Sequence, residues 1–329
     1  MKPNQSNLLS VIIPVYNEEK NILQILRQLE QQTLSNFEVV IVDDGSIDKT
    51  VQLAKEHHAV NFKINLLQQK NMGAARAREN GIMAATCDYV AIVDCDDGLA
   101  DNTLELALQC FINYPEVDIS LFNLCYVNEL SSGVLGQFLY YTNKESVSGK
   151  EALANSIAAW GVHAFGIYRK DVLLQAYDIY NKYNSSHVNF LNNDEVVSRI
   201  SFGLSRRIFF SEAKYFFVNN MGSTTRRVNT NYYKVVQNAF ILHQVLKNSD
   251  LACAGEFESL AYTLIISTQW GVFRRYLSWR KHLLKDAKLV WHCALKVSTH
   301  QVASAYKNYG FALSKKSRLQ LIILKLFFR

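Results

Sequence analysis

Three acidic residues crowd one turn of the chain. Asp94, Asp96 and Asp97 follow an apolar run that begins at Tyr89. Like charges this close repel one another, which raises the cost of ionising all three carboxyls. A divalent cation removes that conflict, and carboxylate oxygens suit Mg²⁺ or Mn²⁺. Because Mg²⁺ usually keeps one or two carboxylates plus substrate phosphates, the turn predicts a metal–phosphate site. The alternative is a solvated acidic turn.

Two earlier turns also follow apolar runs and carry groups that can bind a ligand. The first contains Pro14, Tyr16 and Glu18, and its tyrosine ring can stack on a flat ligand. The second contains Asp44, whose carboxylate can accept a hydrogen bond from a base imide or a ribose hydroxyl. Either turn could instead be an ordinary strand-to-helix connection closed by a capping side chain.

Two basic segments can meet phosphate oxygens. The segment 71–81 is a glycine-containing loop that continues into a helix with two arginines, Arg76 and Arg78. The segment 222–227 combines Ser and Thr hydroxyls with Arg226 and Arg227. Hydroxyls and guanidinium groups suit phosphate. Both segments could also be ordinary basic surface.

The elements that must position these residues alternate between strand and helix. Short, nearly continuous apolar runs predict strands buried on both faces, at 9–15, 37–43, 62–67, 89–94 and 117–123. Helical patterns lie between them, at 18–32, 50–57, 74–85 and 102–113. This order predicts an α/β fold, and ligands of such sheets bind at the carboxyl ends of the strands. All three acidic turns fall at such ends.

The second half of the chain has a different pattern. Residues 131–220 are mixed, with strand-like runs at 166–168 and 208–210, and the chain is helical beyond 231. The segment 192–197 carries Asp194 and Glu195 at the predicted start of a helix. Both carboxyls could serve as a general base, or the segment could simply cap its helix.

In their order and spacing, the segments 10–18, 42–46, 71–81 and 94–97 resemble the inverting glycosyltransferases of family 2. The resemblance is firm over residues 8–130 and weaker to about 230. It implies the GT-A fold, a Rossmann-like, mostly parallel sheet flanked by helices, here with a C-terminal helical region. It implies a glycosyltransferase domain over 1–230, with nucleotide-sugar binding at 8–130 and the acceptor side at 131–230.

The resemblance also implies roles for single residues. Pro14, Tyr16 and Glu18 match the strip that binds base and ribose, and Asp44 matches the carboxylate that meets the base. The remaining assignments concern the diphosphate: Asp94 and Asp96 match the DXD pair that contacts ribose and Mn²⁺ or Mg²⁺, and Arg78 and Arg226 match phosphate-binding positions.

Asp194 aligns best with the family's general base, and Glu195 competes with it because the family more often places Glu before Asp. Trp160 and His163 lie in a segment that could form an acceptor contact or a packed strand end, and His163 could also be an alternative base.

The charge is divided unevenly along the chain. The whole sequence has a net charge of +6, yet residues 259–329 hold 13 Lys or Arg and one acidic residue. Aromatic residues such as Trp270 and Trp279 lie among these cations. Basic, aromatic-rich helices suit the surface of an anionic membrane. We therefore expect 231–329 to be a basic helical membrane-associating region, although a helical lid is the alternative.

Length and composition bound the remaining choices. The chain has 329 residues, is 49% hydrophobic, and contains three Pro and 14 Gly, which excludes a disordered or collagen-like protein. None of its six Cys forms a CxxC pair, and its polar start does not resemble a signal peptide. We expect a cytoplasmic protein, peripheral on the inner face of the plasma membrane.

The predicted function is that of a metal-dependent hexosyltransferase. We expect it to move a sugar from a nucleotide-sugar donor, with a UDP-sugar favoured, to a glycan acceptor, with a lipid-linked one favoured, during synthesis of capsule or a similar cell-surface polysaccharide. No nucleic-acid partner is expected. The sequence also allows two alternatives. One is a non-catalytic membrane-surface binding protein on a degenerate transferase fold, and the other is a sugar-phosphate nucleotidyltransferase. An NAD enzyme is disfavoured because no GxGxxG follows a strand.

Overall fold

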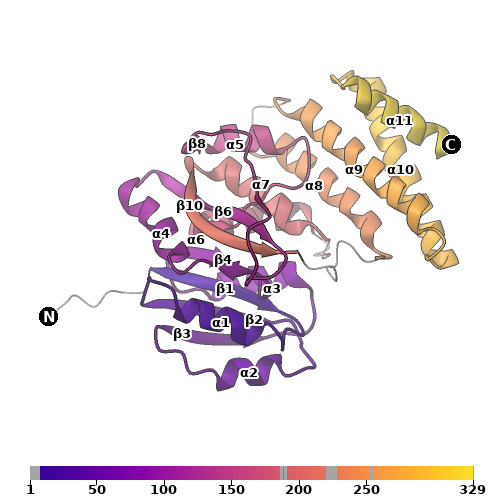
Figure 1. Cartoon of the computed structure of the whole chain (residues 1–329). Helices are drawn as coiled ribbons and strands as arrows, with labels where there is room; N and C mark the ends of the chain where they lie inside the picture. The colour runs from indigo at the N-terminus through magenta and orange to yellow at the C-terminus, as the bar shows by residue number, and fades with distance from the viewer. Residues whose placement is uncertain (1–7, 186–187, 189–190, 220–227, 252–254, 329) are drawn as a thin grey trace. The chain divides into compact units, whose positions relative to one another are not determined.

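The computed structural model describes residues 8–185, 188, 191–219, 228–251 and 255–328. The chain divides into two compact units, a sheet unit and a helical unit (Figure 1). The sheet unit comprises Met1–Ala152, His163–Asp178 and Leu204–Asn220, and the helical unit comprises Leu153–Val162, Ile179–Gly203 and Met221–Arg329.

The described part of the sheet unit contains a mixed sheet. Its strands are β1 (Leu9–Val15), β2 (Phe37–Asp43), β3 (Phe62–Gln68), β4 (Tyr89–Ile92), β5 (Gly98–Leu99), β6 (Val117–Val127), β7 (Gly136–Gln137), β8 (Ser146–Ser148), β9 (Gly166–Arg169) and β10 (Arg207–Val218). They lie in the order β3-β2-β1-β4-β9-β6-β10-β5, with β7 beside β6 and β8 beside β10. Strands β1 to β4 pair in parallel, β6 pairs in parallel with β10, and β9 runs antiparallel between β4 and β6. The predicted mostly parallel sheet is confirmed.

Helices cover both faces of the sheet because its central strands are apolar on both sides (Figure 1). The helices that follow the first strands are α1 (Ile22–Glu30), α2 (Thr50–Glu56), α3 (Ala74–Ala84) and α4 (Thr103–Asn113). One core cluster joins β1 residues Leu9, Val11 and Ile13 to α1 and α4. The α1 helix buries four Ile or Leu side chains on one stripe, each worth roughly 1.5–3 kcal/mol.

The other face of β1 packs against α3 at a very close approach. A Cβ at Gly81 of α3 would lie 2.3 Å from Cγ2 of Ile12 and 3.1 Å from Cγ2 of Val42. Only glycine lets the helix lie this near β1 and β2. The close contact fixes α3, and with it Arg78, against the strands whose ends carry the acidic turns.

The helical unit is built around its own apolar core. Its main helices are α7 (Asn193–Leu204), α8 (Val235–Asn248), α9 (Glu258–Trp279), α10 (Lys285–Tyr309) and α11 (Lys315–Phe327), with a short 3₁₀ turn at Tyr232–Lys234. Two further helices, α5 (Gly149–Ser156) and α6 (Lys170–Tyr183), contribute residues to both units. Trp291 is fully buried in the core and donates its indole N–H to the carbonyl of Thr230 at 2.6 Å.

The region beyond 231, which the sequence predicts to be helical, contains a long helix, α10, that runs from Lys285 to Tyr309. Gly310 then adopts a left-handed conformation, with φ +62°, which ends the helix. Ser314 begins α11 by accepting a hydrogen bond from the backbone N–H of Ser317.

No helix in the described part of the chain combines the length and the apolar character that crossing a membrane requires.

Candidate active site

The acidic turn after β4 is held by a buried tyrosine of β10. The hydroxyl of Tyr215 donates to Oδ2 of Asp97 at 2.8 Å and accepts a hydrogen bond from the backbone N–H of Asp94 at 3.2 Å. The backbone N–H of Val218 donates to the other oxygen of Asp97 at 2.9 Å. Both ends of the turn are therefore tied to the same neighbouring strand.

Asp97 differs from the other two carboxyls of the turn. It is buried, and burial together with the nearby charge of Asp94 raises its pKa well above the usual range. Its two oxygens already accept hydrogen bonds from Tyr215 and Val218. Asp97 thus shapes the turn, while Asp94 and Asp96 remain partly exposed.

Arg78 reaches the acidic turn from α3. Its Nη2 lies 2.7 Å from Oδ1 of Asp94, and both side chains are largely buried. Arg76, two residues earlier on the same helix, instead pairs with Glu79 at 2.6 Å. Of the two arginines of α3 that the sequence singles out, Arg78 is thus the one that lies at the acidic turn.

The turn after β1 is locked to the turn after β2. Asn17, in a left-handed conformation with φ +56°, accepts the N–H of Ile47 at 2.9 Å and donates its own N–H to Oγ of Ser46. The N–H of Glu18 donates to Oγ1 of Thr50 at 2.7 Å. These bonds hold the segment containing Pro14 and Tyr16, and Tyr16 is 48% exposed.

The electrostatics of this sheet edge suit a cation. The pKa of the Glu18 carboxyl is raised by burial and by the negative charges of Asp96, Asp48 and Asp94. The predicted ribose-binding and DXD residues therefore lie close enough to repel one another. Carboxylate oxygens at such a site fit Mg²⁺ or Mn²⁺.

A metal at this edge would depend on a bound ligand. Among the described residues, no three His, Cys, Asp or Glu side chains converge to form a metal site on their own. An ion at Asp94 and Asp96 would have to complete its coordination with diphosphate oxygens and water, as Mg²⁺ commonly does.

Asp44 holds the loop that leads into α3. Its carboxylate accepts hydrogen bonds from the N–H of Met72 and of Gly73, both at 2.7 Å, and from the amide of Gln69 at 2.8 Å. Gln69 in turn accepts from Asn80 at 2.7 Å. Asp44 is buried, and three of its hydrogen-bond acceptor sites are already occupied. Its predicted contact with a nucleotide base would therefore use the remaining acceptor capacity of the carboxylate.

The predicted base stands at the start of α7, in the helical unit. Asp194 is exposed in the first turn of this helix, beside the buried Asn193. The amide of Asn238 on α8 donates to the side-chain oxygens of Asn192 and Asn193, at 2.8 and 3.1 Å. Tyr180 donates to the oxygen of the same Asn238 amide at 3.0 Å. This buried network fixes the turn that carries Asp194.

Glu195, the competing base, is engaged in other interactions. One of its oxygens accepts the backbone N–H of Gly161 at 2.8 Å, and the other pairs with Arg199 at 2.6 Å. Both carboxylate oxygens are therefore in use within the protein.

His163 lies in the sheet unit, in an aromatic cluster. Its Nε2 is 2.9 Å from the hydroxyl of Tyr126, and Phe138, Phe165 and Phe217 surround the ring. Burial lowers the pKa of His163 to about 4. A neutral, packed imidazole agrees with the structural interpretation of this residue.

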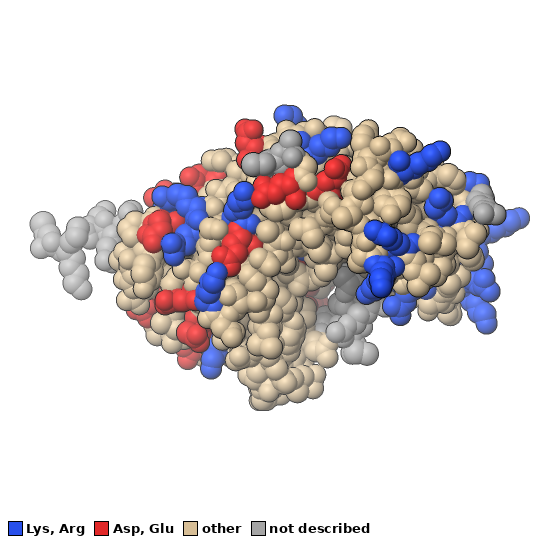
Figure 2. Space-filling model, turned by 90° about the horizontal axis from the view of Figure 1, so that it is seen from above, with Lys and Arg blue, Asp and Glu red and all other residues tan. Residues whose placement is uncertain are grey.

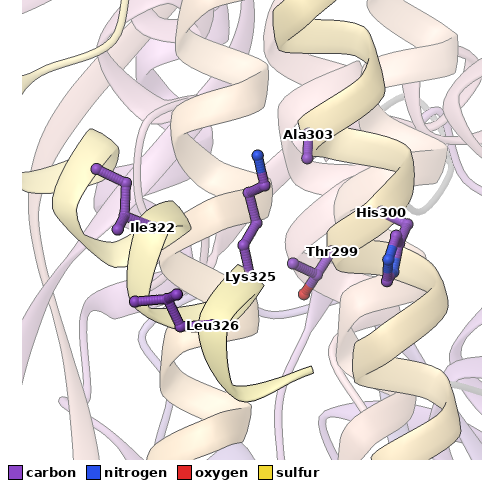
Figure 3. Close-up of a pocket in the computed structure, with 6 residues that line it drawn as sticks. All are labelled: Thr299, His300, Ala303, Ile322, Lys325 and Leu326. Carbon is purple, nitrogen blue, oxygen red and sulfur yellow. The ribbon is translucent and has the colours of Figure 1, made fainter. Parts of the chain in front are cut away.

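The C-terminal helices present a basic surface and a pocket. On the face seen in Figure 2, Lys and Arg side chains spread over α9–α11, while most of the Asp and Glu side chains lie over the sheet unit. The pocket, with a volume of about 260 Å³, lies between α10 and α11 (Figure 3). It is lined by Thr299, His300, Ala303, Ile322, Lys325 and Leu326.

The sequence gives no functional signal for two residues that shape the site. One residue that it does predict lies outside the described part of the chain. Arg226 lies outside the described residues. Tyr215 and Gln69 were not expected, although they hold the acidic turn and the loop before α3. The only signal for Tyr215 is its place in an apolar strand, which does not distinguish it from an ordinary core aromatic.

The fold and this acidic edge define a GT-A transferase domain. The structure matches that of Staphylococcus aureus TarS residues 1–349 with a TM-score of 0.69 and 20% identity, over 98% of this chain and 88% of that one.

Sequence relatives narrow the class. Residues 10–172 match the family model described as glycosyl transferase family 2. YibD of Escherichia coli K12, an uncharacterized glycosyltransferase, is 30% identical over 246 residues, which are 70% of this chain and 68% of YibD. The chain therefore belongs to glycosyltransferase family 2, and the resemblance drawn from its motifs is confirmed.

Two pneumococcal relatives differ in how much of their length is matched. The glycosyltransferase GlyG of Streptococcus pneumoniae serotype 4 is 26% identical over 67% of this chain and 74% of GlyG. GlyA of the same organism is 28% identical over 73% of this chain, which spans only 37% of GlyA.

Proposed function

We propose that this protein transfers a sugar, with inversion, from a UDP-sugar to a glycan acceptor in the synthesis of a cell-surface polysaccharide. The observation that carries the proposal is the cluster formed by Glu18, Asp94 and Asp96 at the carboxyl ends of β1 and β4, with Arg78 paired to Asp94. Family membership argues against the nucleotidyltransferase alternative.

The choice of UDP rests on relatives. TarS of S. aureus, named as a poly(ribitol-phosphate) beta-N-acetylglucosaminyltransferase, is 32% identical over 174 residues, or 52% of this chain and 29% of TarS. TarS structures have been solved with UDP-GlcNAc and with UDP. We propose that the donor of this chain also carries UDP, and we do not propose that it shares the sugar or the acceptor of TarS.

In the proposed donor complex, different residues bind the base, the ribose and the phosphates. The exposed Tyr16 ring stacks on the base, and Pro14 and Glu18 line the ribose. Asp44 positions the loop before α3 and meets the base. Arg78 and Arg226 neutralise phosphate oxygens, since guanidinium groups form strong hydrogen bonds to phosphate.

Asp94 and Asp96 are the residues that would hold Mn²⁺ or Mg²⁺. When bound, the ion supplies Lewis-acid neutralisation of the departing diphosphate. Arg78 pairs with Asp94 at 2.7 Å and thereby orients the carboxylate that would bind the ion.

Inversion requires a base on the face of the sugar opposite the diphosphate. We assign this role to Asp194, which accepts the proton of the acceptor hydroxyl as that oxygen attacks the anomeric carbon. Its exposure at the start of α7 supports the assignment, as does the engagement of both Glu195 oxygens elsewhere.

We further propose that residues 1–230 perform the chemistry and that 231–329 associate with the cytoplasmic face of an anionic membrane, where a lipid-linked acceptor would lie. In support, α11 exposes Leu319, Ile322 and Leu326 on the same helix as the exposed cations Arg318 and Lys325. Apolar side chains beside cations suit the boundary between acyl chains and anionic headgroups. The pocket beside Lys325 offers the same combination (Figure 3).

A donor screen tests the transferase activity. The full chain is titrated with UDP-, GDP- and dTDP-sugars, with and without Mn²⁺, and both thermal shift and nucleotide release are measured. We expect a response that is largest for UDP-sugars and that requires the ion. The absence of any response to every nucleotide sugar in Mn²⁺ would contradict the proposal.

Vesicle binding tests the membrane role separately. The double variant Arg318→Glu with Lys325→Glu changes two exposed cations of α11, and Lys55→Glu with Lys63→Glu makes the same charge change in the sheet unit. On phosphatidylglycerol vesicles, the first variant should bind at least about tenfold more weakly, since each cation near the surface is worth about 1 kcal/mol. Equal binding by both variants would refute the membrane role of α11.

A further inference from the structure

The loop containing Trp160 and Gly161 is fastened to the first turns of α7, within the helical unit. The backbone N–H of Gly161 donates to Oε1 of Glu195 at 2.8 Å. Gly161 has φ +100°, a conformation that favours glycine, and a Cβ there would meet no atom within 4 Å. The glycine therefore serves the backbone path of the loop rather than a tight contact.

A buried arginine completes the attachment. Arg199 is fully buried and pairs with Oε2 of Glu195 at 2.6 Å. Its other N–H groups donate to the carbonyls of Ser156, Ala159 and Glu195, at 2.8, 2.7 and 2.6 Å. A buried guanidinium with this many acceptors fixes their relative positions closely. Arg199 thus holds both ends of the segment 156–159 against α7.

The same arginine covers the indole of Trp160. The guanidinium carbon lies 4.9 Å from the centroid of the ring. At its edge, the indole N–H donates to Oγ1 of Thr268 at 2.8 Å. The ring is therefore fixed on one side and at one edge, yet it remains partly exposed. A rigid, partly exposed aromatic surface of this kind suits the apolar C–H face of a sugar ring.

The contacts of Glu195 connect the Trp160 ring to the candidate base, Asp194. Glu195, which anchors the loop, follows Asp194 directly, and Asp194 is exposed in the first turn of α7. The hydrogen bond from Gly161 to Glu195 and the ion pair of Glu195 with Arg199 therefore fix the loop relative to Asp194. A ligand resting on Trp160 would be held at a fixed place relative to Asp194.

We infer that Trp160 binds a pyranose ring of the acceptor glycan, and that Glu195 and Arg199 are positioning residues that hold this ring beside the turn carrying Asp194. The inference rests on the proposed function and adds to it the place where the acceptor binds. It also gives Glu195 a role other than that of the base.

The first experiment measures pyranoside binding without turnover. Methyl glycosides of glucose, galactose and N-acetylglucosamine are titrated against the full chain, and saturation-transfer NMR and tryptophan fluorescence are recorded. At least one glycoside should bind the wild type, Trp160→Phe should bind it within about threefold, and Trp160→Ala should bind at least tenfold more weakly. Trp279→Phe, a partly exposed tryptophan of the same unit, serves as the control.

The second experiment separates positioning from acid–base chemistry, using the kinetics of sugar transfer from a UDP-sugar to the methyl glycoside that binds most tightly. Glu195→Gln retains an acceptor for the Gly161 N–H but removes the charge that pairs with Arg199. It should raise the acceptor KM at least fivefold, leave the donor KM unchanged and keep the wild-type pH profile of kcat. Thr268→Val, which removes the hydrogen bond to the Trp160 indole, should raise the acceptor KM in the same direction.

The outcomes distinguish this inference from the function on which it rests. Equal pyranoside binding by the wild type and Trp160→Ala, or no binding by the wild type, would overturn the role of Trp160 in acceptor binding. Loss of the acidic limb of the pH profile, where a required base becomes protonated, in Glu195→Gln would overturn its positioning role. Failure of the wild type to turn over any nucleotide sugar would instead refute the proposed function, whatever the glycosides do.

Discussion

Tyr215 on β10 donates its hydroxyl to Asp97 at 2.8 Å, across 118 positions of the sequence. The same hydroxyl accepts the N–H of Asp94. One buried oxygen therefore holds both ends of the turn that presents Asp94 and Asp96. The antiparallel pairing of β5 with β10, which sets Leu99 opposite Tyr215, brings the two segments together.

Tyr215→Phe should destabilise the protein and weaken donor binding together. The substitution leaves the buried Asp97 short of one donor and the Asp94 N–H without its acceptor, a loss of about 1–3 kcal/mol in the free energy of unfolding. Urea unfolding measures the stability, and calorimetry with UDP and Mn²⁺ measures the affinity. Tyr114→Phe, at an exposed tyrosine, is the control. Unchanged unfolding of Tyr215→Phe would show that the hydroxyl does not hold the turn.

Asp96→Asn should reduce the metal-dependent part of nucleotide binding. Asp96 is partly exposed, so the protein should keep its stability while one oxygen ligand is weakened. We expect UDP affinity in Mn²⁺ to fall at least about tenfold, or ~1.4 kcal/mol, with little change in affinity without the ion. Asp101→Asn, at an exposed carboxyl of the same unit, should behave as wild type. A metal response that survives in Asp96→Asn would refute the assignment of this ligand.

His163 should make the protein less stable in mild acid. Its pKa is lowered from 6.5 to about 4, so between these values the unfolded chain binds a proton that the folded chain does not. The free energy of unfolding therefore falls as the pH falls through this window. From pH 7 to pH 5, wild type should lose roughly 1–2 kcal/mol more than His163→Gln in urea unfolding. His58→Gln, at an exposed histidine, should lose as much as wild type, and an equal loss in His163→Gln would contradict the expectation.

The sequence predicts the first half of the fold well because its signals there are local. The strands β1 and β2 begin and end where their apolar runs do. The α1 helix follows from Ile22, Ile25, Leu26 and Leu29, which form one stripe. The α6 helix was not predicted, since its buried stripe mixes Val172, Leu173 and Ala176 with tyrosines.

The site could be predicted only where the residue types themselves, or a family motif, indicate a chemical role. Asp94 and Asp96 stand out by charge density, and Arg78 by its place in a family motif. The hold of Tyr215 on their turn arises from strand pairing between distant segments, which no local pattern reveals. Glu195 was a candidate base in the sequence, and only the contacts with Gly161 and Arg199 reveal its second use.

Asp194→Asn tests most directly whether α7 supplies the base of an inverting transfer. Sugar transfer and UDP affinity are measured on the same protein, with Asp178→Asn as a control at an exposed carboxyl of α6. Transfer should fall by roughly 10²–10⁴-fold, the usual contribution of a general base, because the asparagine amide cannot take the proton of the acceptor. UDP affinity in Mn²⁺ should stay at the wild-type value. Transfer by Asp194→Asn at the wild-type rate would contradict the proposed mechanism.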